Sequence, residues 1–254
     1  MGWLHALVDV PASLHSEAAR FWSAALGWDV GPPWPGHPEL RSLEPAVGEA
    51  YVHLQEIGGA PRAPRVHIDL EVDDVAVARA RAATLGAGIT SEQEQWSALR
   101  SPGGLPFCVV RRPEEPHRAP EPVSWPEGHR SRLVQVCIDS PADVHDAELA
   151  FWHELLGEDG WAPSDSPEFG GKWHDGAGSP LQLLWQRLDE PTGPVRAHFD
   201  LGTDDLEAET ARLLRLGAED LAPGRGWHAL RDPLGLAFCV TRNSPEQSLI
   251  RKLS

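Results

Sequence analysis

"RVHIDLEVDDV" at residues 65–75 and "RAHFDLGTDDL" at residues 196–206 are two versions of one stretch of sequence, separated by 131 positions. In each version a histidine is followed by alternating apolar and polar residues, and the stretch ends in paired aspartates. Alternation with a period of two is typical of a β-strand with one buried face. Acidic residues suit the N-terminus of a helix, where they complement the helix dipole. The stretch therefore predicts a strand followed directly by a helix, and it predicts this twice.

The repeat extends well beyond this stretch. Residues 9–28, "DVPASLHSEAARFWSAALGW", resemble residues 139–158, "DSPADVHDAELAFWHELLGE". Residues 96–110, "WSALRSPGGLPFCVV", resemble residues 227–241, "WHALRDPLGLAFCVT". Offsets of 130 and 131 positions recur along both copies, and a constant offset indicates duplication of one unit.

The duplication sets the domain boundaries that we expect. Between the copies, "RRPEEPHRAPEPVSWPEGHR" contains five prolines and no hydrophobic periodicity, which is typical of an extended linker. We expect a first domain, a proline-rich linker, a second domain and a C-terminal tail at residues 1–112, 113–130, 131–244 and 245–254. In each copy the order of predicted elements is βαβββ followed by βαβββ, so the chain contains four such modules. The predicted fold class is α+β.

Capping residues mark where the predicted helices begin and end. The first helix of each copy is expected to begin at Ser13 or a neighbour and at Asp143, because such side chains accept hydrogen bonds from free backbone N–H groups. Gly27 and Gly157 follow the last apolar turn, where glycine commonly ends a helix. The second helix is expected to begin at the aspartate pair of the opening stretch.

Strand parity brings a set of chemically active side chains to one face. Side chains alternate between the two faces of a strand, so each histidine of the opening stretch shares a face with the aspartate two residues later. These pairs are His67 with Asp69 and His198 with Asp200. The first and last strands of each copy add further members, which gives His5, His67 and Cys108, and Gln135, His198 and Cys239. Three ligands that converge from separate strands can form an open metal site, and Cys with His favours Zn²⁺.

Each of these residue types also has a purely structural interpretation. A strand histidine beside an aspartate can be a hydrogen-bonded structural residue, and a strand cysteine is often a small buried hydrophobe. The eleven tryptophans, against one tyrosine, pose the same choice, because large rings fill cores and also line ligand pockets. The tryptophans considered for ligand contact are Trp22, Trp96, Trp152, Trp173 and Trp227.

Composition excludes several classes of partner. The formal net charge of −16 argues against nucleic acid and anionic membranes, which attract clustered Lys and Arg. No signal peptide and no apolar run long enough to cross a membrane is visible in the sequence. Three scattered cysteines do not form a disulfide framework. We therefore expect a cytoplasmic protein.

These motifs resemble the vicinal oxygen chelate superfamily, and in particular its glyoxalase-like domains. The resemblance covers nearly all of both copies and rests on "FW…LG" in the first helix, on "HIDLEVDD" and "HFDLGTDD", and on the terminal "DPLGLAFCV". It implies cupped mixed sheets with helices on the convex face and a small-molecule ligand in the cup. Single-unit relatives commonly dimerise, so a fused pair implies a pseudo-dimer within one chain.

The resemblance also implies positions for metal ligands. Metal-using relatives take His or Gln from the first strand, His from the strand after the midpoint and Glu near the end of the last strand. In this chain those positions correspond, copy by copy, to His5, His67 and Cys108, and to Gln135, His198 and Cys239. Cysteine replaces the family's glutamate in both copies, which leaves the inheritance of the family's metal chemistry open.

Three functions follow as alternatives, because the superfamily spans isomerases, extradiol dioxygenases, epimerases, fosfomycin-inactivating thiol transferases and metal-free proteins that sequester bleomycin. The first is binding of a small molecule between cupped sheets, without the usual metal-ligand glutamate. The second is a glyoxalase-type lyase or isomerase in which a divalent metal, with Zn²⁺ the most compatible, polarises substrate oxygens. The third is a metal-independent enzyme in which a histidine activates a cysteine thiol. Two differences between the copies predict that their sites have diverged: His5 against Gln135, and Ser101 against Asp232.

Overall fold

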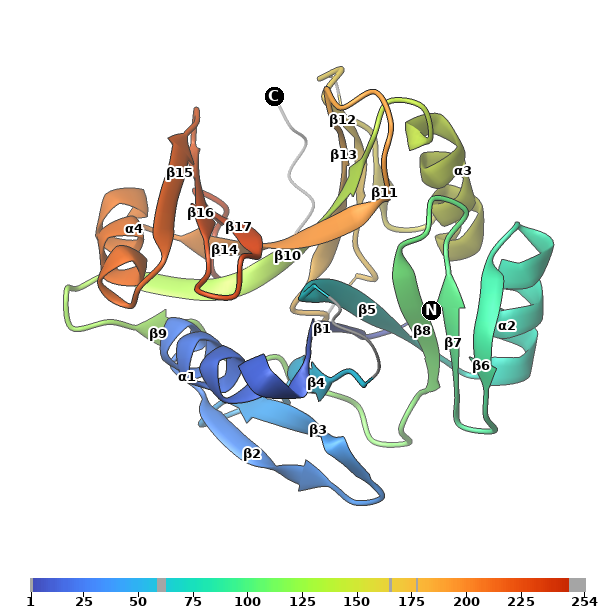
Figure 1. The fold of residues 1–254 in the computed structure, drawn as a ribbon, viewed down its shortest axis with the longest axis horizontal. Coiled ribbons are helices and arrows are strands. Elements are labelled where there is room, and N and C mark those ends of the chain that lie inside the picture. The colour runs from blue at the N-terminus through green and yellow to red at the C-terminus, as the bar shows by residue number, and fades with distance from the viewer. Residues whose placement is uncertain (1, 59–62, 165, 177, 247–254) are drawn as a thin grey trace.

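The computed structural model describes residues 2–58, 63–164, 166–176 and 178–246 and contains two mixed β-sheets with helices packed against them (Figure 1). The first sheet has the strand order β2-β3-β4-β1-β5-β8-β7-β6. The second repeats this order as β11-β12-β13-β10-β14-β17-β16-β15, with β9 added beside β10. In each sheet the two central strands are antiparallel, and each is parallel to its other neighbour. The chain therefore contains four βαβββ modules, which confirms the predicted α+β fold.

The elements of the first domain alternate as the modules require. They are β1 (Leu4–Val10), η1 (Ala12–Leu14), α1 (His15–Leu26), β2 (Asp29–Trp34), β3 (His37–Glu44), β4 (Val52–Glu56), β5 (Arg65–Val72), α2 (Val75–Thr84), β6 (Gly88–Glu92), β7 (Trp96–Arg100) and β8 (Pro106–Arg111).

The connecting segment and the second domain follow the same plan. Their elements are β9 (Val123–Ser124), β10 (Arg130–Ser140), α3 (His145–Leu156), β11 (Trp161–Ala162), β12 (Phe169–Trp173), β13 (Gln182–Arg187), β14 (Arg196–Thr203), α4 (Leu206–Arg215), β15 (Glu219–Pro223), β16 (Trp227–Arg231) and β17 (Ala237–Thr241). The short strand β9 lies within the predicted linker. Of the predicted tail at 245–254, residues 247–254 lie outside the described residues.

The helix ends agree with the sequence at some positions and differ at others. Asp74 caps α2 by accepting a hydrogen bond from the backbone N–H of Val77 at 3.0 Å, as predicted. Gly27 ends α1 with φ of 68°, a left-handed conformation that favours glycine, also as predicted. The predicted caps Ser13 and Asp143 are wrong, because α1 and α3 begin two residues later without a side-chain cap.

The physical reason is a tight turn that precedes each of these two helices. The backbone N–H of Leu14 donates to the carbonyl of Pro11 at 2.9 Å, and that of Val144 donates to the carbonyl of Pro141 at 3.2 Å. These backbone bonds take the place of a side-chain cap, because they already satisfy N–H groups at the start of the helix.

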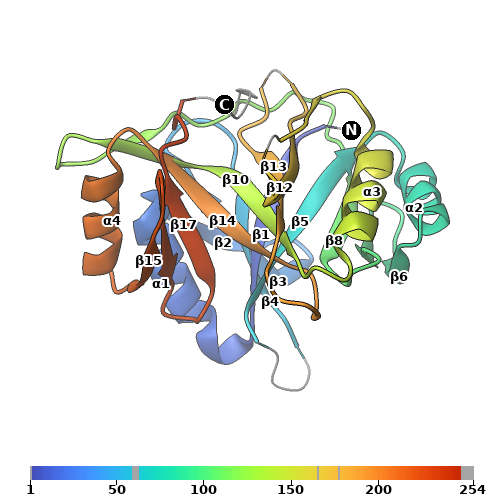
Figure 2. The same ribbon diagram turned by 90° about the horizontal axis from the view of Figure 1, so that it is seen from above.

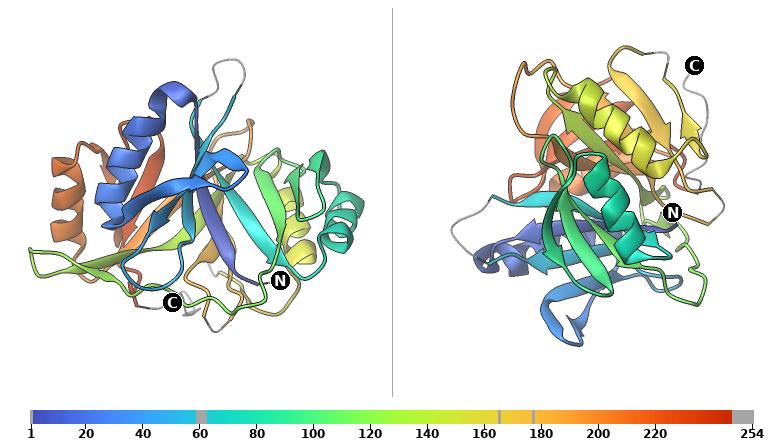
Figure 3. Two further views of the ribbon diagram at one scale, coloured as in Figure 1. Left: turned by 90° about the horizontal axis from the view of Figure 1, so that it is seen from below. Right: turned by 90° about the vertical axis from the view of Figure 1, so that its right-hand side faces the viewer.

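The two domains share one hydrophobic core, because the first helix of each packs against the second module of the other. The Trp22 ring of α1 lies 5.2 Å from Phe199 of β14 and 5.4 Å from Phe238 of β17, between ring centroids. In the same way, the Trp152 ring of α3 lies 5.0 Å from Phe107 of β8. Accordingly α1 lies beside α4 in Figure 2, and α2 beside α3 in the right-hand view of Figure 3. The chain thus forms a pseudo-dimer with interlocked halves.

Ser101 and Asp232 lie at the contacts between the two domains. Asp232, in the loop between β16 and β17, accepts a hydrogen bond from Trp22 Nε1 at 3.0 Å. In the other half the carboxylate comes from the helix, because Glu148 of α3 accepts from Trp152 Nε1 and from the backbone N–H of Gly103, both at 2.8 Å. At one contact the carboxylate lies on the loop, as Asp232, and at the other it lies on the helix, as Glu148. This accounts for the difference between Ser101 and Asp232. Their difference does not report divergence of a ligand site.

No helix among the described residues combines the length and the apolar character needed to cross a bilayer.

Candidate functional site

The face of each sheet that points away from the helices carries the predicted site residues, and we call it the polar face. In the first sheet His67 lies opposite Leu7, and Asp69 lies between His5 on β1 and Cys108 on β8. In the second sheet the register places His198 opposite Cys137, and Asp200 between Gln135 and Cys239. Directly paired residues share a face, so the arrangement inferred from parity is present in both domains.

Four residues on the first polar face form a compact cluster. Nδ1 of His67 lies 2.7 Å from Oδ1 of Asp9, and Nε2 of His67 lies 3.3 Å from Oδ1 of Asp69. The Sγ atom of Cys108 lies within 4.8 Å of the ligand atoms of His67 and Asp69. Arg65 holds the far end through a 2.7 Å contact from Nε to the other oxygen of Asp9.

The second polar face repeats the cluster with nearly the same distances, although only its histidine–aspartate contact through Nδ1 has the geometry of a hydrogen bond. Nδ1 of His198 lies 2.7 Å from Oδ2 of Asp139, and Nε2 lies 3.3 Å from Oδ1 of Asp200. The Sγ atom of Cys239 is 3.7 Å from Nε2 of His198. We call the two clusters the quartets: Asp9, His67, Asp69 and Cys108 in the first domain, and Asp139, His198, Asp200 and Cys239 in the second.

Electrostatics fix the protonation of the quartets. Burial alone would lower the pKa of His67, but Asp9, Asp69 and Cys108 together outweigh burial and raise that pKa well above its usual value. Burial opposes protonation of His198 in the same way, and Asp139, Cys137 and Asp200 together outweigh it and raise the pKa of His198 well above its usual value. Burial raises the pKa of Cys108 to about 12 and also raises that of Cys239. Each quartet is therefore an imidazolium between two carboxylates, beside a protonated thiol.

Asp9 and Asp139 are the site residues that the sequence analysis missed. Both are almost completely buried, and each orients a histidine through its Nδ1 atom. The sequence could have indicated them, because alternation along the first strand of each copy places an aspartate on the polar face. Glu71, His53 and His117 were missed as well, and they gather around His5 instead.

His5 lies apart from the quartet, although the family resemblance grouped it with His67 and Cys108. Its Nε2 atom is 3.0 Å from Oε1 of Glu71, and its Nδ1 atom is 3.0 Å from Nε2 of His53. Among the described residues, the compact group of potential metal ligands that contains His67 also contains Asp69 and Cys108, whereas His5 belongs to a separate group. Gln135 is likewise occupied, because it donates to Asp200 and accepts from Gln182 at 2.7 Å.

This geometry tests the fit of the family's divalent metal. Both ring nitrogens of His67 face carboxylate oxygens, the cysteine that replaces the family's glutamate is protonated, and His5 lies in another cluster. The three family positions therefore do not form a ready ligand set. Zinc binding at Cys108 or Cys239 stays a prediction.

The tryptophans divide by location. Trp22, Trp152 and Trp173 are at most 2% exposed and lie in the core, so packing accounts for their size. Trp96 of β7 pairs with Val110, and Trp227 of β16 pairs with Thr241. Both tryptophans therefore lie on the polar face of their sheet. Ligand contact by Trp96 and Trp227 stays a prediction.

Comparison with known proteins agrees with this architecture. A family described as glyoxalase-like domain matches residues 5–110 and again residues 135–241. Among curated proteins, no sequence matches the chain significantly.

Solved structures give the same fold at low sequence identity. The chain is similar to 2,2',3-trihydroxybiphenyl 1,2-dioxygenase from Sphingomonas wittichii, with 13% identity, a TM-score of 0.58 and coverage of 98% of this chain and 92% of that one. It is similar to a variant of homoprotocatechuate 2,3-dioxygenase from B. fuscum, with 15% identity, a TM-score of 0.60 and coverage of 98% and 73%. A third similar structure is a xylose isomerase-like TIM barrel/4-hydroxyphenylpyruvate dioxygenase fusion protein, with 13% identity, a TM-score of 0.56 and coverage of 93% of this chain. The chain spans 47% of that protein's length.

Two tandem matches, which together span most of the sequence, and the repeated module order lead to one assignment: the chain belongs to the glyoxalase-like domain family.

Proposed function

We propose that this protein binds a small polar molecule at its polar faces, through the quartets and without the family's metal-ligand set. The observation that carries this proposal is the repetition of the quartet. Both copies keep the same four residue types, and the two histidine–carboxylate distances are 2.7 Å and 3.3 Å in each. A buried charged cluster is costly unless it is fully paired, so its preservation in two copies favours a common role.

The charges of the quartet indicate the chemistry of the ligand. Each quartet has two carboxylates and one imidazolium, and in the first domain Arg65 also pairs with Asp9. The outer carboxylates, Asp69 and Asp200, therefore keep acceptor capacity for a ligand. Access differs between the copies: the side chain of Asp69 is 16% exposed, whereas in the second quartet His198 is 13% exposed and Asp200 is 6% exposed. A ligand with hydroxyl or amino groups would donate hydrogen bonds to these oxygens.

The names of the structural neighbours suggest where a search should begin. Two of them are dioxygenases named for 2,2',3-trihydroxybiphenyl and for homoprotocatechuate, which are hydroxyl-bearing aromatic molecules. Hydroxylated aromatics would satisfy the donor requirement of the quartets, and their rings could contact Trp96 or Trp227.

The two enzymatic alternatives receive less support from the geometry. A glyoxalase-type lyase or isomerase needs its metal ligands to converge, and the family positions lie in two clusters. A Cys–His enzyme needs a thiolate nucleophile, whereas burial raises the pKa of both thiols. The contact between His198 and Cys239 is therefore better described as part of a binding surface.

The test is a ligand screen with variants that change only the quartets. Hydroxylated aromatic molecules and small amines would be screened by thermal shift and tryptophan fluorescence, and dissociation constants would be measured for the hits. In the double variant D69N/D200N we expect affinity to fall by about tenfold or more, because each change removes a charged acceptor. The control D220N alters an exposed aspartate that pairs with His228 at 2.7 Å. Hits that bind the double variant as tightly as the wild type would contradict the proposal.

A further inference from the structure

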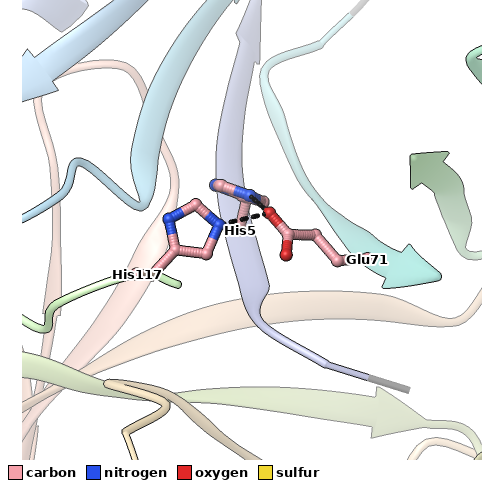
Figure 4. Close-up of side chains that lie close together, drawn as sticks. All are labelled: His5, Glu71 and His117. Carbon is pink, nitrogen blue, oxygen red and sulfur yellow. Dashed lines mark hydrogen bonds and ion pairs between the residues drawn. The ribbon is translucent and has the colours of Figure 1, made fainter. Parts of the chain in front are cut away.

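A second group of side chains lies on the first polar face, and the quartet does not account for it. It comprises His5 of β1, Glu71 of β5 and His117 of the segment between β8 and β9 (Figure 4). Nε2 of His5 lies 3.0 Å from Oε1 of Glu71, and Nε2 of His117 lies 2.7 Å from the same oxygen. Two imidazoles from separate segments therefore converge on one carboxylate. We call these residues the His–Glu–His group.

The donor set matches that of known metal sites. Two histidines and one carboxylate bind zinc in open catalytic sites and iron(II) in non-haem sites. Two ligands about 2.0–2.1 Å from a tetrahedral ion are roughly 3.3 Å apart. The two nitrogen–oxygen distances would therefore need to lengthen only slightly to admit an ion.

One oxygen of the buried Glu71 carboxylate has no hydrogen-bond partner among the described residues. This oxygen is Oε2, and the side chain of Glu71 is 3% exposed. A buried carboxylate oxygen without a partner is costly, and such groups are rare in folded proteins. A cation at the group would supply the missing partner.

The surroundings hold the two histidines as metal ligands are commonly held. Nδ1 of His5 lies 3.0 Å from Nε2 of His53, whose Nδ1 lies 3.1 Å from Oγ of Ser42. His5 can donate its Nδ1 hydrogen to His53, which directs the lone pair of its Nε2 atom toward the group. The ring of His117 stacks on Trp3 with centroids 4.4 Å apart. A hydrogen bond such as that to His53 sets the tautomer of a ligand histidine, and stacking such as that on Trp3 restricts the orientation of the His117 ring.

The second domain shows that the fold does not require this group. Gln135 and Gly202 occupy the positions that correspond to His5 and Glu71, and they lie on the equivalent strands β10 and β14. The same pair of strands therefore forms without either residue. A purely structural role would leave unexplained why only one domain carries the group.

We infer that the His–Glu–His group binds a divalent transition-metal ion through Nε2 of His5, Nε2 of His117 and the carboxylate of Glu71. Only His5 belongs to the positions that the family uses, so the site is displaced from the family's own. The inference is independent of ligand binding at the quartets.

The experiment measures metal affinity in the full chain, purified without an affinity tag or chelator. Zn²⁺ would be titrated in competition with a chromophoric chelator, Fe²⁺ would be titrated under anaerobic conditions, and Co²⁺ would report the donor atoms through its absorption spectrum. The variants H117A and E71Q each remove one ligand. H37A is the matched control, because His37 and Glu39 form an exposed histidine–glutamate pair at 3.1 Å in the same domain. C108S tests the quartet as the competing site.

We expect one equivalent of metal in the wild type, with affinity about tenfold or more weaker in H117A and E71Q and unchanged in H37A and C108S. The Co²⁺ spectrum should lack thiolate charge-transfer bands. Absence of binding, equal affinity in H117A, or loss of binding in C108S would each overturn the inference. Thermal unfolding of every variant would show whether it is folded. If E71Q does not fold, H117A alone decides between the outcomes, because His117 lies outside the sheet.

Discussion

At the scale of single residues, Asp232 has the most clearly perturbed carboxyl group at the domain interface. It is 3% exposed and accepts hydrogen bonds from Trp22 Nε1 and from the backbone N–H groups of Leu234 and Leu236. Burial raises the pKa of Asp232 from 3.8 to about 6, and these hydrogen bonds oppose burial only in part. The folded state therefore keeps a proton that the unfolded state releases between these values. The free energy of unfolding should fall as the pH rises through this window, by about 3 kcal/mol from this group.

D232N should remove this dependence, because asparagine has the same shape and no charge to bury. We expect the free energy of unfolding of D232N, relative to the wild type, to rise by up to about 3 kcal/mol between pH values of about 4 and 7. Urea denaturation at several pH values measures this difference. D146N is the control, since the side chain of Asp146 is 89% exposed. A difference that stays constant with pH would contradict the prediction.

The residues of the site were predictable only as far as local pattern extends. Alternation along one strand was enough to place His67 and Asp69 on one face, because side-chain direction depends only on position in the strand. It was not enough to pair His67 with Asp9, since that contact depends on the register between β5 and β1. The meeting of Glu71 with His117 depends in addition on the path of the linker, which the sequence does not determine.

At the scale of elements, the arginine of a buried ion pair within α4 also bonds to the end of α1 in the other domain. In α4, Nε of Arg212 lies 2.7 Å from Oε2 of Glu209, and both side chains are less than a tenth exposed. Arg212 also donates to the backbone carbonyls of Ala24 and Ala25 at 3.1 Å and 2.7 Å. These carbonyls belong to the last turn of α1, where free acceptors need partners. One guanidinium group thus satisfies a buried carboxylate and a helix end together.

R212Q should be strongly destabilising, because the buried carboxylate of Glu209 loses its guanidinium partner and, among the described residues, keeps only His129 at 2.7 Å and Ser131 at 2.8 Å. We expect the free energy of unfolding to fall by about 3–5 kcal/mol, as is typical when one partner of a buried pair is removed. The chain provides a matched control in α1, where Glu17 and Arg20 form an i,i+3 pair at 3.3 Å with exposed side chains. R20Q should change stability by less than about 0.5 kcal/mol. Chemical denaturation measures the free energy of unfolding of both variants. Equal losses in R212Q and R20Q would contradict this account of Arg212.

Element types were predictable, but their first residues were predictable only in part. The aspartate pair located the start of α2 because Asp74 is a side-chain cap in the structure as well. Ser13 and Asp143 gave the wrong start for α1 and α3, because backbone bonds to Pro11 and Pro141 replace the cap. Proline at a strand end was the available signal, and it predicts a turn more strongly than a cap.

At the scale of the whole molecule, duplication was visible in the sequence but the packing of the two halves was not. Constant offsets predict two similar domains, and they do not say which helix covers which sheet. The structure shows that the Trp22 ring of α1 and the Trp152 ring of α3 are buried against strands of the opposite domain. Each half therefore completes the hydrophobic core of the other, which a pair of merely tethered domains would not do.

This interlock predicts that neither half is stable alone. Residues 1–112 produced by themselves would expose Trp22, and residues 113–254 would expose Trp152, so each should aggregate or remain partly unfolded. Co-expression should restore a one-to-one complex, because each tryptophan then regains its opposing strands. Size-exclusion chromatography and thermal unfolding measure both outcomes. Cleavage of the intact protein at a protease site introduced at exposed Glu114 tests association after both halves have folded. Halves that stay together after cleavage would support the shared core. Two separate folded monomers would show that the domains are only tethered.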